Sequence, residues 1–465
     1  MNSIKFGTDG WRAIIAADYT VDNVRRVSEA TALWLKKTGG NQVVIGYDCR
    51  FGGLLFANTT ASVLGAYGIK VLMSPDFAST PMVSLGVAKT NSHLGVVITA
   101  SHNPPEYNGY KLKSHFGGPL SPAQVSEVEA LVPDICSLTV FPSIEALKEA
   151  GLFEYVNLEE MYLDHVKNSF DLKGIKEANV GVAYDAMYGA GQRALPLILP
   201  DSFKLHCDFN PSFKGQAPEP IHKNLLALSS YISGNQHIQL GIATDGDADR
   251  IGLYDESGRF VDSHHILLLL LLYLGKYKGL KGNVIITFSV TDKMKRLAQI
   301  LDLPIEITPI GFKYIADIMT QKDVLVGGEE SGGLAVKGHI PERDGIWIGL
   351  MILEFMSKSG KSLKQLIQEV YDLVGSFWCD RDDLHITEAQ KQEVINHCNN
   401  KSYTQFGEFK IGETVQMDGT KFLLGNDRWV MIRPSGTEPV LRVYAQAENE
   451  QMVRTILDAT KKAIL

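Results

Sequence analysis

The sequence predicts an α/β protein built from several domains. Its 465 residues exceed what one hydrophobic core holds, and at roughly 100–200 residues per domain they correspond to three or four domains. In the N-terminal part, short apolar runs alternate with segments of helical periodicity, which is typical of parallel strands joined by helices. Beyond Gly360 the predicted elements become shorter, which indicates a smaller α+β domain at the end of the chain.

The first predicted domain alternates strands and helices and is expected to end near residue 140. Apolar spacing predicts helices over 21–37 and 56–67, and Thr80-Pro81 marks the start of another helix. The expected strands cover 4–6, 42–47, 70–73 and 95–98.

The remaining chain continues the alternation. Further strands are expected over 180–184, 239–243, 251–254, 283–289, 305–308, 324–326, 429–432 and 441–447. Further helices are expected over 158–170, 225–233, 266–274, 291–300, 314–319, 346–356 and 363–373.

The stretch VVITASHNPPEYNGYK, residues 96–111, is the centre of the predicted chemistry. Its strand ends in a polar turn with Ser101 and His102, because the two prolines that follow cannot donate to a sheet. Open α/β sheets bind ligands at such strand ends, although a serine in a turn is also a common turn former. Asn108-Gly109 predicts a second tight turn, which brings Lys111 onto another extended run.

A glycine-rich loop near the start of the chain, GTDGWR, carries one permanent cation. Two glycines three positions apart predict a sharp turn, and Arg12 follows them. The fixed fork of donors on a guanidinium suits phosphate. A plain surface turn with an exposed arginine is the alternative.

A third loop, TDGDADR, lies between two apolar runs. Asp245, Asp247 and Asp249 repel one another unless a cation neutralises them, and hard oxygen ligands select Mg²⁺ or Ca²⁺. With Glu256 they also match the spacing of an EF-hand calcium loop. Arg250 stands where that loop needs glycine, and short strands flank the motif, so we favour a different kind of metal site.

The loop GGEESGG combines a carboxylate and a hydroxyl with several glycines. Glycine allows a ligand to approach the backbone closely, and Glu329 and Ser331 alternate along an extended segment and so point the same way. This pair suits sugar hydroxyls, and a flexible surface turn is the alternative. Lys313, near the start of a predicted helix, could meet an anion or remain solvated.

The last motif, RPSGTEP, joins two predicted strands. It offers Arg433, Ser435, Gly436 and Thr437, with Arg442 just inside the next strand. An arginine, two hydroxyls and a glycine turn favour a phosphate site over a plain turn.

Composition argues against several classes of protein. A net charge of −8 without a long basic block argues against nucleic-acid binding. The longest apolar run, 266–274, is shorter than the roughly 20 residues that span a membrane, and it predicts a buried helix capped by Asp262 or Ser263. Five scattered cysteines and an N-terminus without an apolar signal core are consistent with a reduced, cytoplasmic enzyme.

Taken together, the serine loop, DGDADR, GEESGG and RPSGTEP, with the GTDGWR start, resemble the α-D-phosphohexomutase superfamily, most closely its bacterial-type phosphoglucomutases and phosphomannomutases. The resemblance implies four domains around a central cleft, three similar α/β domains and a smaller α+β domain that closes over substrate phosphate. We expect these domains at residues 1–140, 155–257, 258–372 and 377–465.

The resemblance also implies roles for individual residues. It implies that Ser101 is phosphorylated and that its phosphate completes a Mg²⁺ site with the three aspartates. It implies Lys111 and Arg250 as general acid/base candidates beside the serine. The other implied site residues are His102 and Arg12 near the phosphoserine, Glu329, Ser331 and Lys313 for the sugar, and Arg433, Ser435, Gly436, Thr437 and Arg442 for the phosphate.

The resemblance implies a mutase that interconverts hexose 1-phosphates and 6-phosphates through a 1,6-bisphosphate, with glucose 1,6-bisphosphate as activator. Gly333 replaces a histidine that mannose- and glucosamine-type members often carry, so we favour glucose phosphates, then mannose phosphates, then glucosamine phosphate. A hexose 1,6-bisphosphate synthase is an alternative, and a non-catalytic calcium- or sugar-phosphate-binding protein is one from another class. We expect a monomer or a dimer that binds neither nucleic acid nor membrane.

Overall fold

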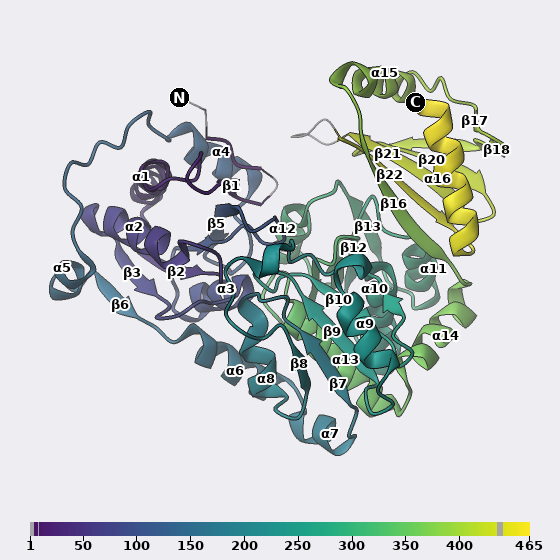
Figure 1. Ribbon diagram of the computed structural model, residues 1–465, viewed down its shortest axis with the longest axis horizontal. Helices are drawn as coiled ribbons and strands as arrows, with labels where there is room; N and C mark the ends of the chain where they lie inside the picture. The colour runs from purple at the N-terminus through teal and green to yellow at the C-terminus, as the bar shows by residue number, and fades with distance from the viewer. Residues whose placement is uncertain (1–3, 8, 435–439) are drawn as a thin grey trace.

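The computed structural model describes residues 4–7, 9–434 and 440–465. Figure 1 shows successive α/β layers from the purple N-terminal part to the green part, and a yellow C-terminal domain at the upper right. The prediction of three mixed α/β domains followed by a smaller α+β domain is confirmed.

The first sheet has six strands in the order β1-β5-β4-β2-β3-β6. Four of them are parallel: β2 (Gln42–Tyr47), β3 (Lys70–Met73), β4 (Leu94–Ile98) and β6 (Phe153–Tyr155). β5 (Tyr107–Ser114) runs antiparallel to β4 and to β1 (Trp11–Ile14). The helices are α1 (Val21–Thr38), α2 (Gly53–Ala66), α3 (Thr80–Lys89), α4 (Pro122–Ala130) and α5 (Ile144–Glu149).

The second sheet, β11-β10-β9-β7-β8, repeats this plan. β7 (Val182–Asp185), β8 (Phe203–Leu205) and β9 (Leu240–Thr244) are parallel, and β10 (Ile251–Tyr254) turns back against β9 and pairs with β11 (Phe260–Val261). Its helices are α6 (Leu158–Ser169), α7 (Leu172–Glu177), α8 (Ala194–Ile198) and α9 (Leu226–Ser233).

The third sheet, β13-β12-β14-β15, follows the same plan with fewer strands. β12 (Asn283–Thr287) is parallel to β13 (Ile305–Thr308) and β14 (Val324–Gly328), and β15 (Leu334–Val336) is antiparallel to β14. Its helices are α10 (Ser263–Leu271), α11 (Lys293–Ile300), α12 (Phe312–Gln321), α13 (Gly345–Ser359) and α14 (Leu363–Val374).

The fourth sheet is antiparallel throughout, in the order β16-β22-β21-β20-β19. Its strands are β16 (Trp378–His385), β19 (Glu413–Gln416), β20 (Thr420–Gly425), β21 (Arg428–Pro434) and β22 (Val440–Ala447). The helices α15 (Glu388–Asn399) and α16 (Glu450–Ile464) and the small hairpin of β17 (Gln405–Phe406) and β18 (Phe409–Lys410) complete this domain.

One apolar core runs through the first three sheets. Val44 and Val83 of the first layer, Ile242 of the second and Ile346 of the third belong to the same cluster of buried side chains. The fourth domain has its own core around Phe406 and other residues, and a small apolar cluster with Phe288 joins it to the third.

Several predicted elements have different boundaries in the structure. Residues 4–6 form no strand, and the first strand is β1, which was expected to be loop. Asn108 and Gly109 lie inside β5 instead of making a turn, because this segment pairs with β1 on one side and β4 on the other. The helix predicted from 266 begins at Ser263 with Asp262 as its N-cap, and continues as a π-helix over Leu272–Tyr277.

Three of the four chemical motifs occupy the same place in their sheets. The serine loop joins β4 to β5, TDGDADR joins β9 to β10, and GGEESGG joins β14 to β15. In each case a parallel strand is connected to its antiparallel neighbour, so each α/β layer presents one such loop at the carboxyl end of a parallel strand. RPSGTEP lies between β21 and β22, and residues 435–439 are outside the described part.

Candidate active site

Ser101 lies in the turn after β4, in a backbone conformation that a buried network holds. Its φ of 52° is left-handed, which costs energy for a residue with a side chain. Its amide donates to Thr99 Oγ1 at 2.8 Å, and Arg50 donates to its carbonyl oxygen at 2.6 Å. Asp48 Oδ2 accepts the Thr99 hydroxyl at 2.6 Å and lies 3.2 Å from Arg50 Nε. The direction of the Ser101 side chain is therefore fixed by the fold.

The Ser101 hydroxyl reaches the TDGDADR loop of the second layer, residues 244–250, which we call the metal loop. Its Oγ donates to Asp245 Oδ2 at 2.6 Å and lies 3.3 Å from Nδ1 of His102. Burial, with the positive charges of Arg250 and Arg12, holds the pKa of His102 well below its usual value. His102 is therefore neutral at physiological pH.

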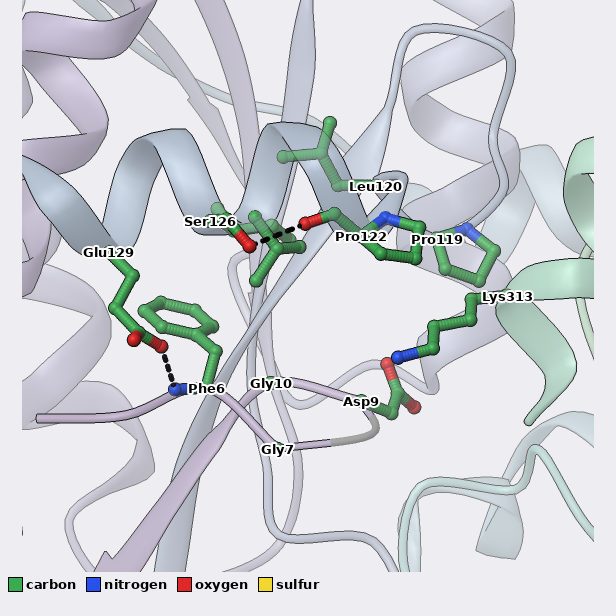
Figure 2. A pocket seen from close by; sticks show the side chains of 12 residues that line it. Phe6, Gly7, Asp9, Gly10, Pro119, Leu120, Pro122, Ser126, Glu129 and Lys313 are labelled. Atoms are coloured by element: carbon green, nitrogen blue, oxygen red, sulfur yellow. Dashed lines mark hydrogen bonds between the residues drawn. The ribbon is translucent and has the colours of Figure 1, made fainter. Parts of the chain in front are cut away.

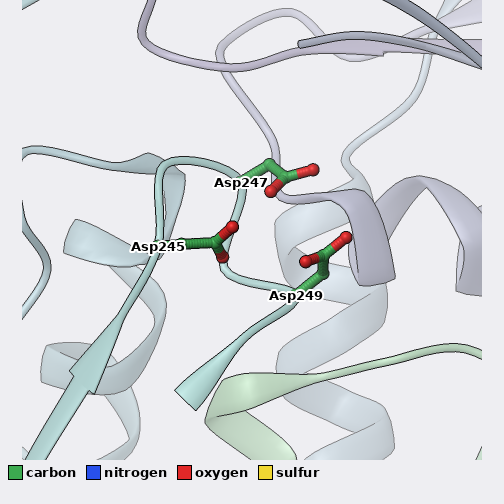
Figure 3. Close-up of side chains that lie close together, drawn as sticks. All are labelled: Asp245, Asp247 and Asp249. Carbon is green, nitrogen blue, oxygen red and sulfur yellow. The ribbon is translucent and has the colours of Figure 1, made fainter. Parts of the chain in front are cut away.

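The three aspartates of the TDGDADR loop converge on a common point. Figure 3 shows the three carboxylate groups near one another beside the loop, and one oxygen of each lies within 4.8 Å of the others. Asp245, Asp247 and Asp249 are fully buried, and Oδ1 of Asp247 and of Asp249 has no hydrogen-bond partner among the described residues. Buried carboxylate oxygens without donors are costly unless a cation binds them, so the residues present fit a divalent metal ion with oxygen ligands. The strands on either side exclude the helix-flanked EF-hand.

The surroundings shift the pKa values of Asp245 and Asp247 in opposite directions. Burial, together with the charges of Asp247 and Asp249, raises the pKa of Asp245 well above its usual value. Burial would also raise the pKa of Asp247, but the ammonium group of Lys111 and a 2.5 Å hydrogen bond from Thr80 lower it.

Lys111 projects from β5 into this cluster and is fully buried. Its Nζ lies 2.8 Å from Asp247 Oδ2, 3.0 Å from Asp249 Oδ2 and 2.9 Å from Asp9 Oδ2. Burial would lower the pKa of Lys111, but the surrounding carboxylates raise it above its usual value. Lys111 is therefore a charged donor within the metal site.

Asp9 and Arg343 join the cluster from the first and third layers, and the sequence reasoning missed both. Arg343 pairs with Asp9, with Asp249 Oδ2 at 2.7 Å and with Glu342 Oε1 at 3.5 Å. Glu342 Oε2 also accepts from Lys113 at 2.7 Å. Asp9 stands in the GTDGWR motif, a signal that could have identified it, whereas the sequence around Arg343 gives no comparable signal.

Asp48 and Arg50 were also missed as functional residues. They directly follow the predicted strand 42–47, and this position at a strand end could have identified them as candidates. In the structure this strand lies next to the serine strand. Their role in the structure is to hold the serine turn, because Arg50 also donates to the carbonyl oxygens of Asn103 and Pro104, at 2.6 and 2.7 Å.

Arg12 and Arg250 border the serine. Arg12 donates to Asn103 Oδ1 at 2.6 Å, which ties it to the serine loop. Arg250 donates its amide to Asp245 Oδ1 at 3.0 Å, and its NH1 lies 3.9 Å from Glu219 Oε1. Its Nε is buried without a partner among the residues that the structure describes. Both guanidinium groups can therefore serve an anion near Ser101.

The GGEESGG loop touches the metal loop directly. Gly333 forms a β-bridge with Arg250, and Glu329 is 5% exposed. Burial raises the pKa of Glu329 to about 7, against the opposing effect of Arg343. Gly333 has no room for a side chain, because a Cβ there would lie 2.4 Å from Cδ of Arg343. Ser331 is partly exposed in the same loop.

Lys313 lies at the start of α12. It lines a cavity of about 120 Å³ with Asp9, Gly10 and residues of α4. Figure 2 shows its amino group pointing toward the carboxylate of Asp9. The structure therefore places Lys313 where the first and third layers meet.

The predicted phosphate residues of the fourth domain lie on neighbouring strands. Arg433 of β21 is opposite Arg442 of β22. Arg433 pairs with Asp418, at 3.0 Å from Nε to Oδ1, and Nε of Arg442 lies 3.8 Å from Asp383 Oδ1. The predicted residues Ser435, Gly436 and Thr437 lie outside the described residues.

Comparison with known proteins agrees with this arrangement. Four models of the phosphoglucomutase/phosphomannomutase family match the chain: the alpha/beta/alpha domains I, II and III over residues 3–137, 160–258 and 262–374, and the C-terminal domain over 387–463.

Relatives and solved structures cover nearly the whole chain. A phosphoglucomutase/phosphomannomutase of Thermococcus kodakarensis is 30% identical over 97% of this chain and 96% of its own length. A phosphoglucosamine mutase of Methanococcus aeolicus is 31% identical over 91% of each chain. A crystal structure from Thermus thermophilus, named as a phosphomannomutase, has a TM-score of 0.88 and 32% identity, covering 100% of this chain and 99% of that one.

The part of the chain that the structure describes contains no helix both long and apolar enough to cross a membrane. The matched family models, the repeated α/β plan and the convergence of serine, aspartates and lysine agree with one another. The chain belongs to the phosphoglucomutase/phosphomannomutase family of α-D-phosphohexomutases, whose members are isomerases.

Proposed function

We propose that this protein interconverts hexose 1-phosphates and hexose 6-phosphates through a phosphorylated Ser101, with glucose phosphates as the preferred substrates. The observation that carries the proposal is the 2.6 Å hydrogen bond from Ser101 Oγ to Asp245. It joins a hydroxyl fixed by the first layer to a metal-ligand set on the second.

Phosphoryl transfer needs stabilisation of the charge that spreads over the oxygens of the transferred group. Asp245, Asp247 and Asp249 would hold a divalent ion, which we propose to be Mg²⁺ because the ligand set is oxygen only. Such an ion supplies electrostatic stabilisation of the phosphoryl oxygens. Lys111, Arg12 and Arg250 add fixed positive charge around the same place.

In the first half of the cycle the phosphoryl group moves from Ser101 to the sugar. The bond between phosphorus and Ser101 Oγ breaks while a bond to a sugar hydroxyl oxygen forms. The hydroxyl proton passes to a base, and the serine oxygen takes up a proton. Lys111 and Arg250 are the candidates for these proton transfers, and Lys111 is charged and so suited to donate.

In the second half the bisphosphate reverses its orientation and returns its other phosphoryl group to Ser101. Arg433 and Arg442, with Ser435, Gly436 and Thr437, would hold the phosphate that does not react. Glu329 would accept hydrogen bonds from the sugar hydroxyls, and Ser331 would donate hydrogen bonds to them. Glucose 1,6-bisphosphate would rephosphorylate a chain that has lost its phosphate and so act as activator.

The sugar preference rests on the third layer. At Gly333 the space is taken by Arg343, so no side chain can approach the sugar from that position. This differs from the histidine-bearing loop of many mannose- and glucosamine-type enzymes and supports glucose phosphates. The phosphoglucosamine mutases among the relatives make glucosamine phosphate the second candidate to test.

A phosphorus NMR time course tests the proposal. The protein, Mg²⁺ and a trace of glucose 1,6-bisphosphate are mixed in parallel with glucose 1-phosphate, mannose 1-phosphate and glucosamine 1-phosphate. Fastest conversion of the glucose compound is expected, and Ser101→Ala should abolish it while keeping the circular-dichroism spectrum. Conversion of none of them refutes the mutase, and retained activity in Ser101→Ala refutes the phosphoserine. Accumulation of a bisphosphate only with an added phosphoryl donor would indicate a synthase.

A further inference from the structure

The loop that holds Asp9 beside Lys111 lies in close contact with β5. The amide of Gly7 donates to the Gly10 carbonyl at 2.9 Å, which closes the turn around Asp9. Gly10 has a φ of 89°, and a Cβ there would lie 2.6 Å from the Tyr110 carbonyl oxygen and 3.1 Å from Cα of Lys111. Glycine at position 10 therefore lets the loop lie directly on β5.

The Asp9 carboxylate binds three cations. Its Oδ2 lies 2.9 Å from Nζ of Lys111 and also pairs with Arg343, and its Oδ1 lies 3.7 Å from Nζ of Lys113. The side chain is 13% exposed. Burial would raise the pKa of Asp9, but Lys111, Lys113 and Arg343 hold it well below its usual value, so Asp9 is ionised.

Lys111 has three carboxylate partners, and two of them belong to the metal loop. Its ammonium group contacts Oδ2 of Asp247 and Oδ2 of Asp249, on the side chains that fit a divalent ion. A metal ion bound to the Oδ1 atoms of these two carboxylates, which lack a hydrogen-bond partner among the described residues, would therefore lie close to the ammonium group, and the two positive charges would repel each other. Asp9 is the partner of Lys111 that lies outside this set.

We propose that Asp9 is the positioning residue for Lys111: it holds the ammonium group beside the transferring phosphoryl group when Asp247 and Asp249 bind the metal ion. The inference rests on the proposed function and extends it to a residue of the GTDGWR loop. Arg343 pairs with the same oxygen, Oδ2 of Asp9, so the alignment of the first and third layers sets where Lys111 lies.

A purely structural salt bridge between Asp9 and Arg343 is the competing explanation, and the two differ in their effect on metal binding. If Asp9 draws Lys111 away from the metal loop, Asp9→Asn leaves the ammonium group to Asp247 and Asp249, and metal affinity falls. A structural salt bridge would change the melting temperature and leave the metal affinity unchanged.

The test compares Asp9→Asn with Glu342→Gln, using Mn²⁺ alone as the probe and the electron paramagnetic resonance signal of free Mn²⁺ as the readout. Glu342→Gln is the matched control, because it removes a buried carboxylate of the same cluster whose ion pairs are with Lys113 and Arg343. We expect Asp9→Asn to weaken Mn²⁺ binding about tenfold, the size of one charge-assisted hydrogen bond, and more than Glu342→Gln does. Asp9→Glu should restore part of the affinity.

Turnover provides the second readout at saturating Mg²⁺. Asp9→Asn should lower kcat with little change in KM, because Lys111 acts on the transferred group. Mn²⁺ affinity within twofold of the unaltered protein, an equal fall in Glu342→Gln, or an unchanged kcat overturns the inference. Absence of turnover in the unaltered protein would refute the mutase, and the Mn²⁺ titration would still decide the role of Asp9.

Discussion

Replacing Gly333 by alanine tests whether the third layer controls the metal loop. The new Cβ would lie 2.4 Å from Cδ and 3.2 Å from Cγ of Arg343, and 3.3 Å from Oε2 of Glu329. The Arg343 side chain cannot simply move aside, because its guanidinium group is held by Asp9, by Asp249 at 2.7 Å and by Glu342.

The expected loss of stability in Gly333→Ala follows from these contacts. Forcing a methyl group into a filled site costs about 1–3 kcal/mol. If Arg343 moves and its pairing with Asp249 is lost, a charge-assisted hydrogen bond worth about 1.5–3 kcal/mol goes with it. The shift is roughly 2–4 °C per kcal/mol for a unit of 150–250 residues and smaller for the larger unit of three layers, so a fall of a few degrees in melting temperature is expected. A distorted metal loop should also lower kcat/KM by at least about tenfold, which corresponds to about 1.4 kcal/mol.

Scanning calorimetry and steady-state turnover measure the two effects. Gly412→Ala is a matched control, since the nearest atom to its added Cβ is the Leu423 carbonyl oxygen at 3.6 Å and the site lies in the fourth domain. The decisive comparison repeats Gly333→Ala in an Arg343→Ala background, where the clash is gone and the substitution should cost almost nothing. An equal cost in both backgrounds, or no cost in either, would refute the reasoning.

Three further outcomes follow from the structure. After chelation, added Mg²⁺ should restore turnover of the unaltered protein. Asp247→Asn should abolish this stimulation of turnover, because it removes one carboxylate of the triad. Arg433→Ala should raise KM for hexose phosphates about tenfold or more with a smaller effect on kcat, since a guanidinium–phosphate contact is worth roughly 1.5–3 kcal/mol; an unchanged KM would count against a phosphate site on β21. Burial, with the nearby His339, lowers the pKa of His165 to about 4, below its ordinary value of 6.5. The stability that neutral His165 provides is therefore complete above pH 6.5 and lost as the pH falls toward 4, so His165→Gln should flatten the melting temperature over that range.

The α/β layers could be predicted because their strands are continuous apolar runs. Segments 42–47 and 70–73 match the observed strands, since a buried parallel strand needs apolar residues on both faces. The turn predicted at Asn108-Gly109 was wrong because turn propensity is local, whereas the pairing with β1 comes from residues about a hundred positions away. The strand over residues 11–14 was missed for the same reason.

The candidate site could be predicted only where its residues stand in compact motifs. Ser101, Lys111 and the three aspartates lie in short loops, and the structure brings them together. Arg343 has no local signal, because its role arises from contacts with Asp9 and Asp249 in other layers. Lys313 was assigned to the sugar by the family resemblance, and the structure places it in a cavity that Asp9 also lines.

The apolar core that the first three sheets share determines how the protein unfolds. Each layer has a buried cluster of its own, but Val44, Ile242 and Ile346 also belong to one continuous cluster, so the unfolding of one layer exposes apolar surface of the next and the three should melt as a single cooperative unit. The fourth domain, with its own cluster around Phe406, can unfold before or after them. The centre around Ser101 is therefore lost in one step, whereas the strands that carry Arg433 and Arg442 can unfold while that centre stays intact.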